Sequence, residues 1–215
     1  MSIEHFFYGF DLAGTLVFAI SGAIAAVKKR LDIYGIFILA IVTALGGGML
    51  RDVILGRTPP PVFTDGFYLA VSCLGALIVV LFHKTIDRFH HPLRIMDALG
   101  LGIFTVIGAR VTLEVGGSWF AAVMLGVITG TGGGMIRDIL SREVPLVLQR
   151  EVYAVASLAG ALAYIVWLQI PPIFGIPLPA GLGAVLSAAL TASLRIISVY
   201  KNWHLPKVNG RISHS

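Results

Sequence analysis

Seven long apolar runs dominate the sequence, and they restrict the chain to a fold built inside a membrane. About 20 helical residues are needed to cross roughly 30 Å of hydrocarbon, and runs of this length recur between breaks that carry proline or charge. The runs are apolar on all sides, unlike the helices of a soluble bundle, and lack the alternation of barrel strands. Because lipid cannot hydrogen-bond the backbone, helices remain. The predicted spans are about 7–27, 34–55, 66–82, 97–113, 119–140, 152–169 and 178–200.

The composition agrees with a chain that lies almost entirely in lipid. Hydrophobic residues make up 57% of the 215 residues and charged residues only 13%, whereas a soluble domain carries about a quarter charged residues. The formal net charge of +5 indicates basic cytoplasmic loops, and we expect no nucleic-acid partner. We therefore predict one transmembrane domain over residues 1–200 and a cytoplasmic tail over residues 201–215.

The distribution of basic residues predicts the orientation of the chain. Lys and Arg concentrate on the cytoplasmic side of multi-pass proteins. Of the 16 Lys and Arg residues, only Arg51, Arg57 and Arg110 lie on the side of the membrane where the first predicted helix begins. We therefore expect the N-terminus outside and the C-terminus in the cytoplasm.

The sequence contains an internal repeat. Residues 43–52 (TALGGGMLRD) match residues 129–138 (TGTGGGMIRD) at an offset of 86 positions. A chance match of three glycines is plausible, but a match that extends over three consecutive spans is not. Further pairs at this offset, or at one residue less, are Asp11 and Asp97, Gly14 and Gly100, Phe18 and Phe104, Gly22 and Gly108, Pro59 and Pro145, and Tyr68 and Tyr153.

The repeat predicts an inverted architecture. Its copies cover about residues 7–83 and 94–169, and a seventh helix at about 178–200 lies outside it. Each copy has three spans, so the second copy enters the membrane from the opposite side. This is the plan of many transport proteins. The predicted fold class is all-α integral membrane, with two inverted three-helix repeats plus a seventh helix.

The two glycine triplets are the most informative motif. Each Gly destabilises a helix interior by about 1 kcal/mol relative to Ala, so three in a row make a weak point. A break there would free backbone groups at membrane depth, which is tolerated only inside protein or beside a water-filled path. We therefore expect kinked helices that border a polar path. Close helix packing is the alternative, and both can hold together. The residues concerned are Gly46, Gly47, Gly48, Gly132, Gly133 and Gly134.

Several polar residues within or beside the spans are candidates for the lining or mouths of this path. Each has a structural alternative: an acid can stabilise a helix N-terminus, a Ser or Thr can bond its own helix, and an Arg-Asp pair can anchor a helix end. The candidates are Asp11, Thr15, Ser21, Thr43, Arg51, Asp52, Asp97, Thr105, Thr129, Thr131, Arg137 and Asp138.

The sequence does not favour an enzyme. It contains no recognisable nucleophile–base pair or metal-ligand spacing, and its glycine triplets lack the Lys-Ser/Thr of a phosphate-binding loop. We expect no catalytic residue, no metal site and no cofactor.

The paired stretches at 46–52 and 132–138, with seven helices in two repeats, resemble the bacterial and archaeal relatives of the trimeric intracellular cation (TRIC) channels, which carry the glycine-transporter-domain description (UPF0126-type). The likeness covers about residues 5–200. It implies a homotrimer with one pore per protomer, potassium as the main permeant ion, sodium also permeant, pore roles for the glycine triplets, and location in the inner (plasma) membrane with possible bound lipid. The Lys-Glu-Val tripeptide of animal members, tied to phosphoinositide binding, is absent; Arg142-Glu143-Val144 is only a loose likeness, so that lipid site is not carried over.

Three functions compete at this point. A passive cation channel predicts a continuous hydrated path. A carrier for glycine or another small solute predicts a closed binding site at mid-membrane, with the glycine breaks binding the ends of the substrate. A purely structural membrane protein is the third, but it would not need symmetric, destabilising glycines.

Overall fold

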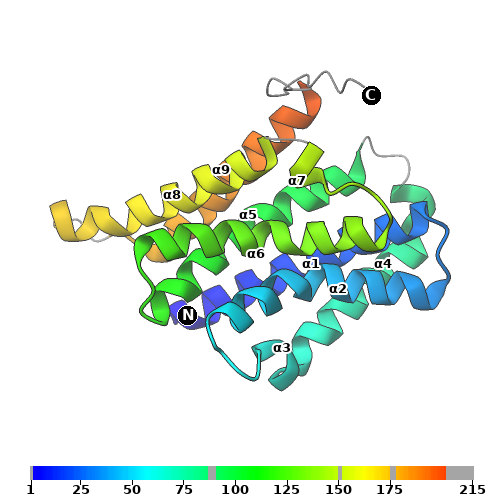
Figure 1. Ribbon diagram of the computed structural model, residues 1–215, viewed down its shortest axis with the longest axis horizontal. Coiled ribbons are helices and arrows are strands. Elements are labelled where there is room, and N and C mark those ends of the chain that lie inside the picture. The colour runs from blue at the N-terminus through cyan, green and yellow to red at the C-terminus, as the bar shows by residue number, and fades with distance from the viewer. Residues whose placement is uncertain (1, 87–90, 150–151, 175–177, 202–215) are drawn as a thin grey trace, which may run out of the picture.

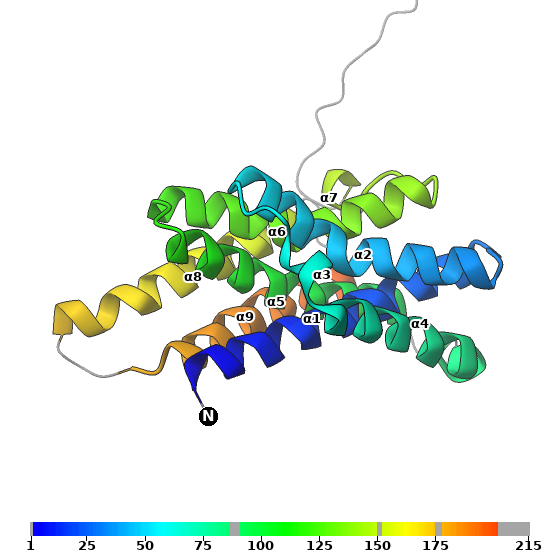
Figure 2. The same ribbon diagram turned by 90° about the horizontal axis from the view of Figure 1, so that it is seen from below.

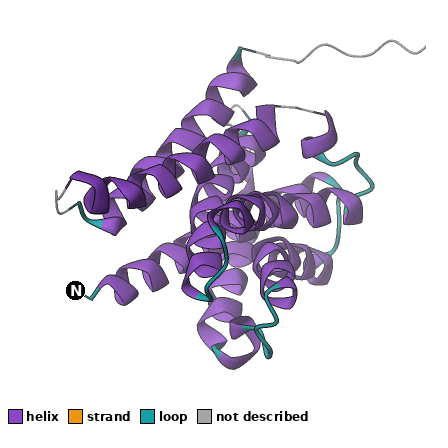
Figure 3. Cartoon of the chain, turned by 60° about the vertical axis from the view of Figure 1, so that its left-hand side comes forward, coloured by secondary structure: helices purple, strands orange, loops and turns teal. Residues whose placement is uncertain are grey.

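The computed structural model describes residues 2–86, 91–149, 152–174 and 178–201. Within these ranges the chain is helical, with no strand drawn (Figure 3). Seven helices are long and apolar enough to cross a membrane, which confirms the seven predicted spans. The long helices are α1 (Ile3–Lys28), α2 (Ile33–Ile54), α4 (Gly66–Ile86), α5 (Pro92–Glu114), α6 (Trp119–Leu140), α8 (Val152–Phe174) and α9 (Ala180–Tyr200).

Several helices extend past the apolar runs that predict them. The Ser2 side chain accepts a hydrogen bond from the His5 amide and begins α1 four residues early. Pro92 takes the first position of α5, where its fixed φ suits a helix start. α8 runs to Phe174, beyond the predicted end at 169. Hydrophobicity marks the hydrocarbon-spanning part, whereas capping residues decide where the backbone stops being helical.

The helices form two groups of three that match the two repeats. α1, α2 and α4 pack together, and so do α5, α6 and α8. The groups meet where α1 packs on α5 and α2 packs on α6 (Figures 1 and 2). The seventh helix, α9, packs on α5 and α8, at the edge of the second group.

Two short helices occupy equivalent places in the repeats and were not predicted. α3 (Pro61–Thr64) follows α2, and α7 (Leu146–Gln149) follows α6. The turns before them fold alike: the Arg57 amide donates to the Asp52 carbonyl at 2.8 Å, and the Glu143 amide donates to the Asp138 carbonyl at 2.9 Å. The repeat therefore extends into the connections.

Seven crossings put the start of α1 and the end of α9 on opposite sides of the bundle. We call these the N-side, where α1 begins, and the C-side, where α9 ends. α2 ends on the N-side and α6 on the C-side, so the two Arg-Asp pairs lie on opposite sides. The predicted tail falls almost wholly on residues 202–215, which lie outside the described residues.

Candidate functional site

The two glycine triplets lie where α2 crosses α6, at the interface of the repeats. A Cβ atom placed on Gly47 would overlap the carbonyl oxygen of Thr129. One placed on Gly133 would overlap the carbonyl oxygen of Thr43. Thr43 and Gly47 are the repeat partners of Thr129 and Gly133, so the crossing is symmetric. Only glycine lets the two backbones approach this closely.

The expected break in these helices is absent. α2 is helical across Gly46–Gly48 and α6 across Gly132–Gly134. The close contact explains why: the missing side chains are used for packing against the partner helix rather than for opening the backbone. A bend of the helix axes at these glycines stays a prediction.

The threonines of the crossing bond their own helices. The Thr43 hydroxyl donates to the Leu39 carbonyl at 2.5 Å, and the Thr129 hydroxyl donates to the Leu125 carbonyl at 2.5 Å. Each also lies against a small residue, because a Cβ at Gly22 or Gly108 would sit 2.5 Å from the Thr43 or Thr129 hydroxyl oxygen, respectively. These hydroxyls are therefore occupied by backbone contacts.

On the C-side, Arg137 of α6 centres a fully buried polar cluster. Its Nη1 donates to Asp97 Oδ1 of α5 at 2.6 Å and to Ser21 Oγ of α1 at 2.6 Å. Its Nε donates to Asp138 Oδ1 at 2.9 Å. Arg137, Asp97 and Ser21 are each 0% exposed. We call Asp97, Arg137, Asp138 and Ser21 the C-side cluster; it joins helices of both repeats.

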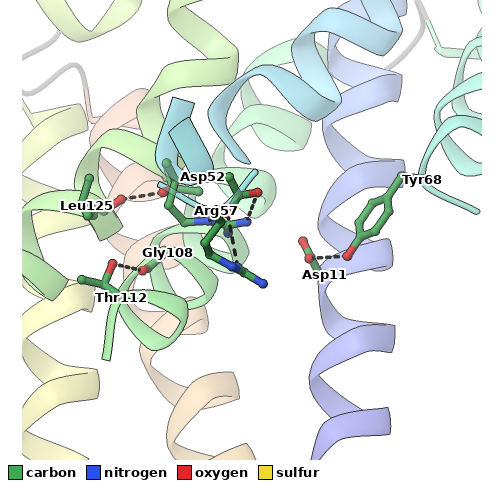
Figure 4. Close-up of polar contacts among 9 residues, drawn as sticks. Asp11, Asp52, Arg57, Tyr68, Gly108, Thr112 and Leu125 are labelled. Atoms are coloured by element: carbon green, nitrogen blue, oxygen red, sulfur yellow. Dashed lines mark hydrogen bonds and ion pairs between the residues drawn. The ribbon is translucent and has the colours of Figure 1, made fainter. Parts of the chain in front are cut away.

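On the N-side, the equivalent residues are arranged differently. Arg51 donates from Nε and Nη2 to its neighbour Asp52 at 3.0 Å. Arg57 donates to the same carboxylate at 3.3 Å. Asp11 instead accepts a hydrogen bond from the Tyr68 hydroxyl at 2.8 Å. Figure 4 shows that the Tyr68 ring points at Asp11, and that Arg57 lies beside Asp52. We call these five residues the N-side cluster.

Two cavities meet at Asp11. The inner one has a volume of about 20 Å³ and lies among Asp11, Thr15, Gly48, Arg51 and Tyr68. A space of this size holds about one water molecule. The outer one has a volume of about 140 Å³ and is lined by Asp11 and by residues of the N-side ends of α1 and α5. Asp11 is thus the residue that the two cavities share.

A third cavity approaches from the C-side. It has a volume of about 300 Å³, and Lys28, Arg94, Asp138 and Glu143 are among its lining residues. Asp138 belongs to the C-side cluster, so this cavity ends at the Arg137 ion pair. Lys29, which directly follows α1, forms an ion pair with Glu143, and both residues line this cavity, so the pair links the two repeats.

An aromatic pair separates the two clusters. The rings of Phe18 and Phe104, which are repeat partners, have centroids 5.1 Å apart. Phe104 lines the inner N-side cavity, and Phe18 lies against Gly133. Gly134, the next residue, adjoins the Asp97 carboxylate. A path between the cavities would have to pass these rings and then the Arg137 ion pair.

The structure brings most predicted residues into the two clusters, but Thr15, Thr105 and Thr131, like the threonines of the crossing, lie outside them. The Thr15 and Thr131 hydroxyls donate to the Asp11 and Val127 carbonyls of their own helices, although Thr15 also lines the inner cavity. The Thr105 hydroxyl bonds Ser157 at 2.6 Å. Their role in a path stays a prediction.

Several residues of the site were not among the candidates predicted from the sequence. The repeat pairing of Phe18 with Phe104, and of Tyr68 with Tyr153, was a usable signal, because both pairs lie at the clusters. Arg195 gave no such signal, since α9 is outside the repeat. It is 2% exposed, and its guanidinium lies 4.8 Å from the Tyr153 ring centroid.

The fold and the site together define a class: multi-pass membrane proteins of two inverted three-helix repeats, with polar residues gathered where the repeats meet. A family model described as glycine transporter matches the chain twice, at residues 8–84 and 94–169. The chain belongs to this family, that of the UPF0126 membrane proteins and TRIC channels, as its paired motifs predict.

Curated relatives and solved structures support the same family. The chain is 42% identical over 178 residues to a UPF0126 membrane protein of Deinococcus radiodurans, covering 82% of this chain and 81% of that one. It is 35% identical over 199 residues to the UPF0126 inner membrane protein YadS of Escherichia coli K12, covering 92% and 93%.

Among solved structures, a TRIC cation channel studied for its conductance has a TM-score of 0.81 at 36% identity, over 99% of this chain and 100% of that one. The TRIC orthologue of Rhodobacter sphaeroides has a TM-score of 0.83 at 32% identity, over 92% and 98%.

Proposed function

We propose that the protein is a passive channel for monovalent cations, with the path inside each protomer. The supporting observation is the alignment of the two clusters on either side of the Gly47–Gly133 crossing, in a chain that matches solved cation channels over nearly its whole length. Inverted-repeat proteins place their transport path at such an interface.

The chemistry of the N-side cavities suits a cation. Asp11 lines both of them, and Asp52 lines the inner one. Carboxylate and hydroxyl oxygens can replace the water shell of an ion. Since the inner cavity holds about one water molecule, an ion would pass largely stripped of water. A large, weakly hydrated ion loses its shell most easily, so potassium is the proposed main ion and sodium a second.

The proposed open state requires movement at two places. On the C-side, the ion pair between Arg137 Nη1 and Asp97 Oδ1, which are 2.6 Å apart, must break. The glycine triplets offer a place for α2 and α6 to bend, because a helix without side chains there can change its axis at low cost. Movement of the two helices at one crossing would alter both clusters together.

The proposed setting is the inner (plasma) membrane, with the N-side outside and the C-side in the cytoplasm. The positive-inside rule supports this orientation. We further propose a homotrimer with bound membrane lipid, by likeness to the trimeric relatives.

The test is single-channel recording from purified protein in a planar bilayer under a potassium chloride gradient. Discrete steps that reverse near the potassium potential are expected. Current that reverses near the chloride potential would exclude a cation channel. The control is a preparation unfolded by heat before reconstitution, which should give no steps.

A carrier for glycine is the second candidate. It is favoured by the description of the family model, and the inverted repeat also suits alternating access. Saturable glycine uptake into liposomes by a preparation that is silent in the bilayer would select it.

A further inference from the structure

Arg110 lies near the N-side end of α5, in the wall of the outer cavity. This cavity has a volume of about 140 Å³, and Glu4, Asp11 and Glu114 also line it. Within the part of the chain that the structure describes, Arg110 is the one basic residue in its lining. Asp11 lines the inner cavity as well, so the guanidinium shares a cavity with the carboxylate that connects the outer cavity to the N-side cluster.

Two contacts from two helices hold the Arg110 guanidinium in place. Its Cζ lies 3.5 Å from the ring centroid of Phe7 in α1, in a cation–π contact. Its Nη2 lies 2.5 Å from Glu114 Oε1, one turn further along α5. The Phe7 ring is 4% exposed, so it is a rigid platform. The outer cavity therefore contains a positive charge whose position is fixed.

The acidic residues of the outer cavity act on ions through their field. Among the described residues, no three acidic, histidine or cysteine side chains lie close enough to hold a metal ion, so Glu4, Asp11 and Glu114 do not form an ion site together. They still attract cations through the electrostatic potential of the cavity. A divalent cation gains twice the energy of a monovalent one from the same potential. A path for monovalent ions therefore needs an opposing charge here.

We propose that Arg110 is a specificity-determining residue, whose fixed charge keeps divalent cations out of the outer cavity more strongly than monovalent cations. This inference rests on the proposed channel function. It does not depend on the total charge of the N-side, where Arg51, Arg57 and Asp52 form a separate paired set. Whatever that total is, removing the guanidinium makes the potential at the cavity more negative by the same amount for every ion.

The charge of the ion gives this inference a quantitative signature. If removing the guanidinium raises the local concentration of a monovalent cation by some factor, it raises that of a divalent cation by the square of the factor. For one unit charge at the edge of a hydrated cavity, we expect a factor of about two to five for potassium. The factor for magnesium is then about four to 25. A loss of packing alone would not depend on the charge of the ion.

The first experiment compares wild type, Arg110→Gln and Arg110→Lys in planar bilayers. It measures the potassium concentration for half-maximal conductance, and the magnesium concentration that halves the potassium current when magnesium is present on both sides. In Arg110→Gln both concentrations should fall, the magnesium value by about the square of the potassium factor. Arg110→Lys keeps the charge and should stay near wild type.

Two control variants test the sign and the place of the charge. Glu4→Gln removes a negative charge from the same cavity and leaves both contacts of Arg110 intact, so it should raise both concentrations. Lys84→Gln removes a positive charge from an exposed position at the C-side end of α4, and solvent and salt should screen its effect. Equal factors for potassium and magnesium in Arg110→Gln would overturn the inference. So would an Arg110→Lys variant that behaves like Arg110→Gln.

A second experiment measures the potential of the outer cavity without any current. Val111 lines this cavity, so Val111→Cys, combined with Cys73→Ala, places a single thiol there. The rates at which a cationic and an anionic methanethiosulfonate reagent modify this thiol give a ratio that rises as the potential becomes more negative. Adding Arg110→Gln should raise the ratio by about four- to 25-fold, and adding Arg110→Lys should leave it unchanged. An unchanged ratio in Arg110→Gln would overturn the inference even in a conducting channel. A silent wild-type protein would instead remove the proposed function, and this ratio would still decide whether Arg110 sets the potential of the cavity.

Discussion

The N-side and C-side clusters are built from the same repeated motif, yet their arginines bind different carboxylates. On the C-side, Arg137 reaches Asp97 at 2.6 Å, and both side chains are fully buried. On the N-side, Arg51 bonds only its neighbour Asp52, and a cavity of about 20 Å³ lies between Arg51 and Asp11.

Two substitutions between the repeats explain the difference. Ser21 accepts a hydrogen bond from Arg137, whereas the repeat partner of Ser21 is Ile107, which can accept none. Arg57 forms an ion pair with Asp52, whereas its repeat partner Glu143 pairs with Lys29.

An inverted repeat therefore need not arrange its two equivalent clusters in the same way. The backbone crossing is symmetric, so the asymmetry comes from a few polar side chains. This makes the clusters, rather than the glycines, the place to test the two sides against each other.

The largest expected effect comes from removing the central arginine of each cluster. Breaking a buried ion pair leaves an uncompensated charge, so Arg137→Gln should lower the free energy of unfolding by about 3–5 kcal/mol. Arg51→Gln should cost about 1–2 kcal/mol, because its Asp52 partner keeps Arg57. Thermal or denaturant unfolding in detergent measures both.

The control for both variants is Arg142→Gln, which removes an exposed arginine shortly after Arg137 and should be nearly neutral. Equal losses for Arg137→Gln and Arg51→Gln would contradict the view that the additional buried partners of Arg137 stabilise the C-side cluster.

The next effect tests the symmetric part of the interface. Gly47→Ala and Gly133→Ala each force a methyl group onto a backbone carbonyl, and overpacking of this kind costs about 1–3 kcal/mol. Because the two contacts are repeat partners, the two losses should be alike. Both variants should also alter single-channel conductance if the crossing moves during opening.

Gly9→Ala is the matched control, since a Cβ there would meet nothing within 4 Å. It removes a helical glycine without a steric clash and should be neutral or slightly stabilising. A large difference between Gly47→Ala and Gly133→Ala would show that the asymmetry reaches the helix crossing and is not confined to the charged side chains.

The sequence predicts the fold well because its strongest constraint is physical. Length and apolarity identify all seven spans, and the match of residues 43–52 with 129–138 identifies the repeat. The helix ends differ from prediction where capping decides them, as at Ser2 and Pro92. Hydrophobicity does not report on capping.

The site was predicted only in part, for a different physical reason. The repeat register identified Asp97, Arg137 and their N-side partners, but a register cannot say which partner each side chain chooses. It gave no indication that Arg137 would bond Asp97 while Arg51 would not bond Asp11. Arg195 could not be found this way, because its position depends on how α9 packs against α8. The predicted helix break at the glycines is absent, because the glycines let the backbones of α2 and α6 pack closely against each other.

The smallest expected effect lies at the N-side surface, where the Tyr8 hydroxyl donates to Asp65 Oδ2 at 2.6 Å and the Phe67 amide donates to Oδ1 at 2.9 Å. These two hydrogen bonds favour the charged carboxylate and hold the pKa of Asp65 below its ordinary value. A lowered folded-state pKa means that the stabilising contribution is present above the ordinary Asp pKa of about 3.9 and is lost as the pH falls through the lowered value.

Tyr8→Phe should therefore lower the melting temperature slightly at neutral pH, and the difference from wild type should vanish in acid. Tyr34→Phe, at an exposed tyrosine of α2 on the C-side, should show no such dependence. A Tyr8→Phe difference that persists unchanged in acid would mean that the tyrosine stabilises this side by packing rather than through the carboxylate. The charge-dependent surface contact would then be found on the C-side, where Lys29 pairs with Glu143.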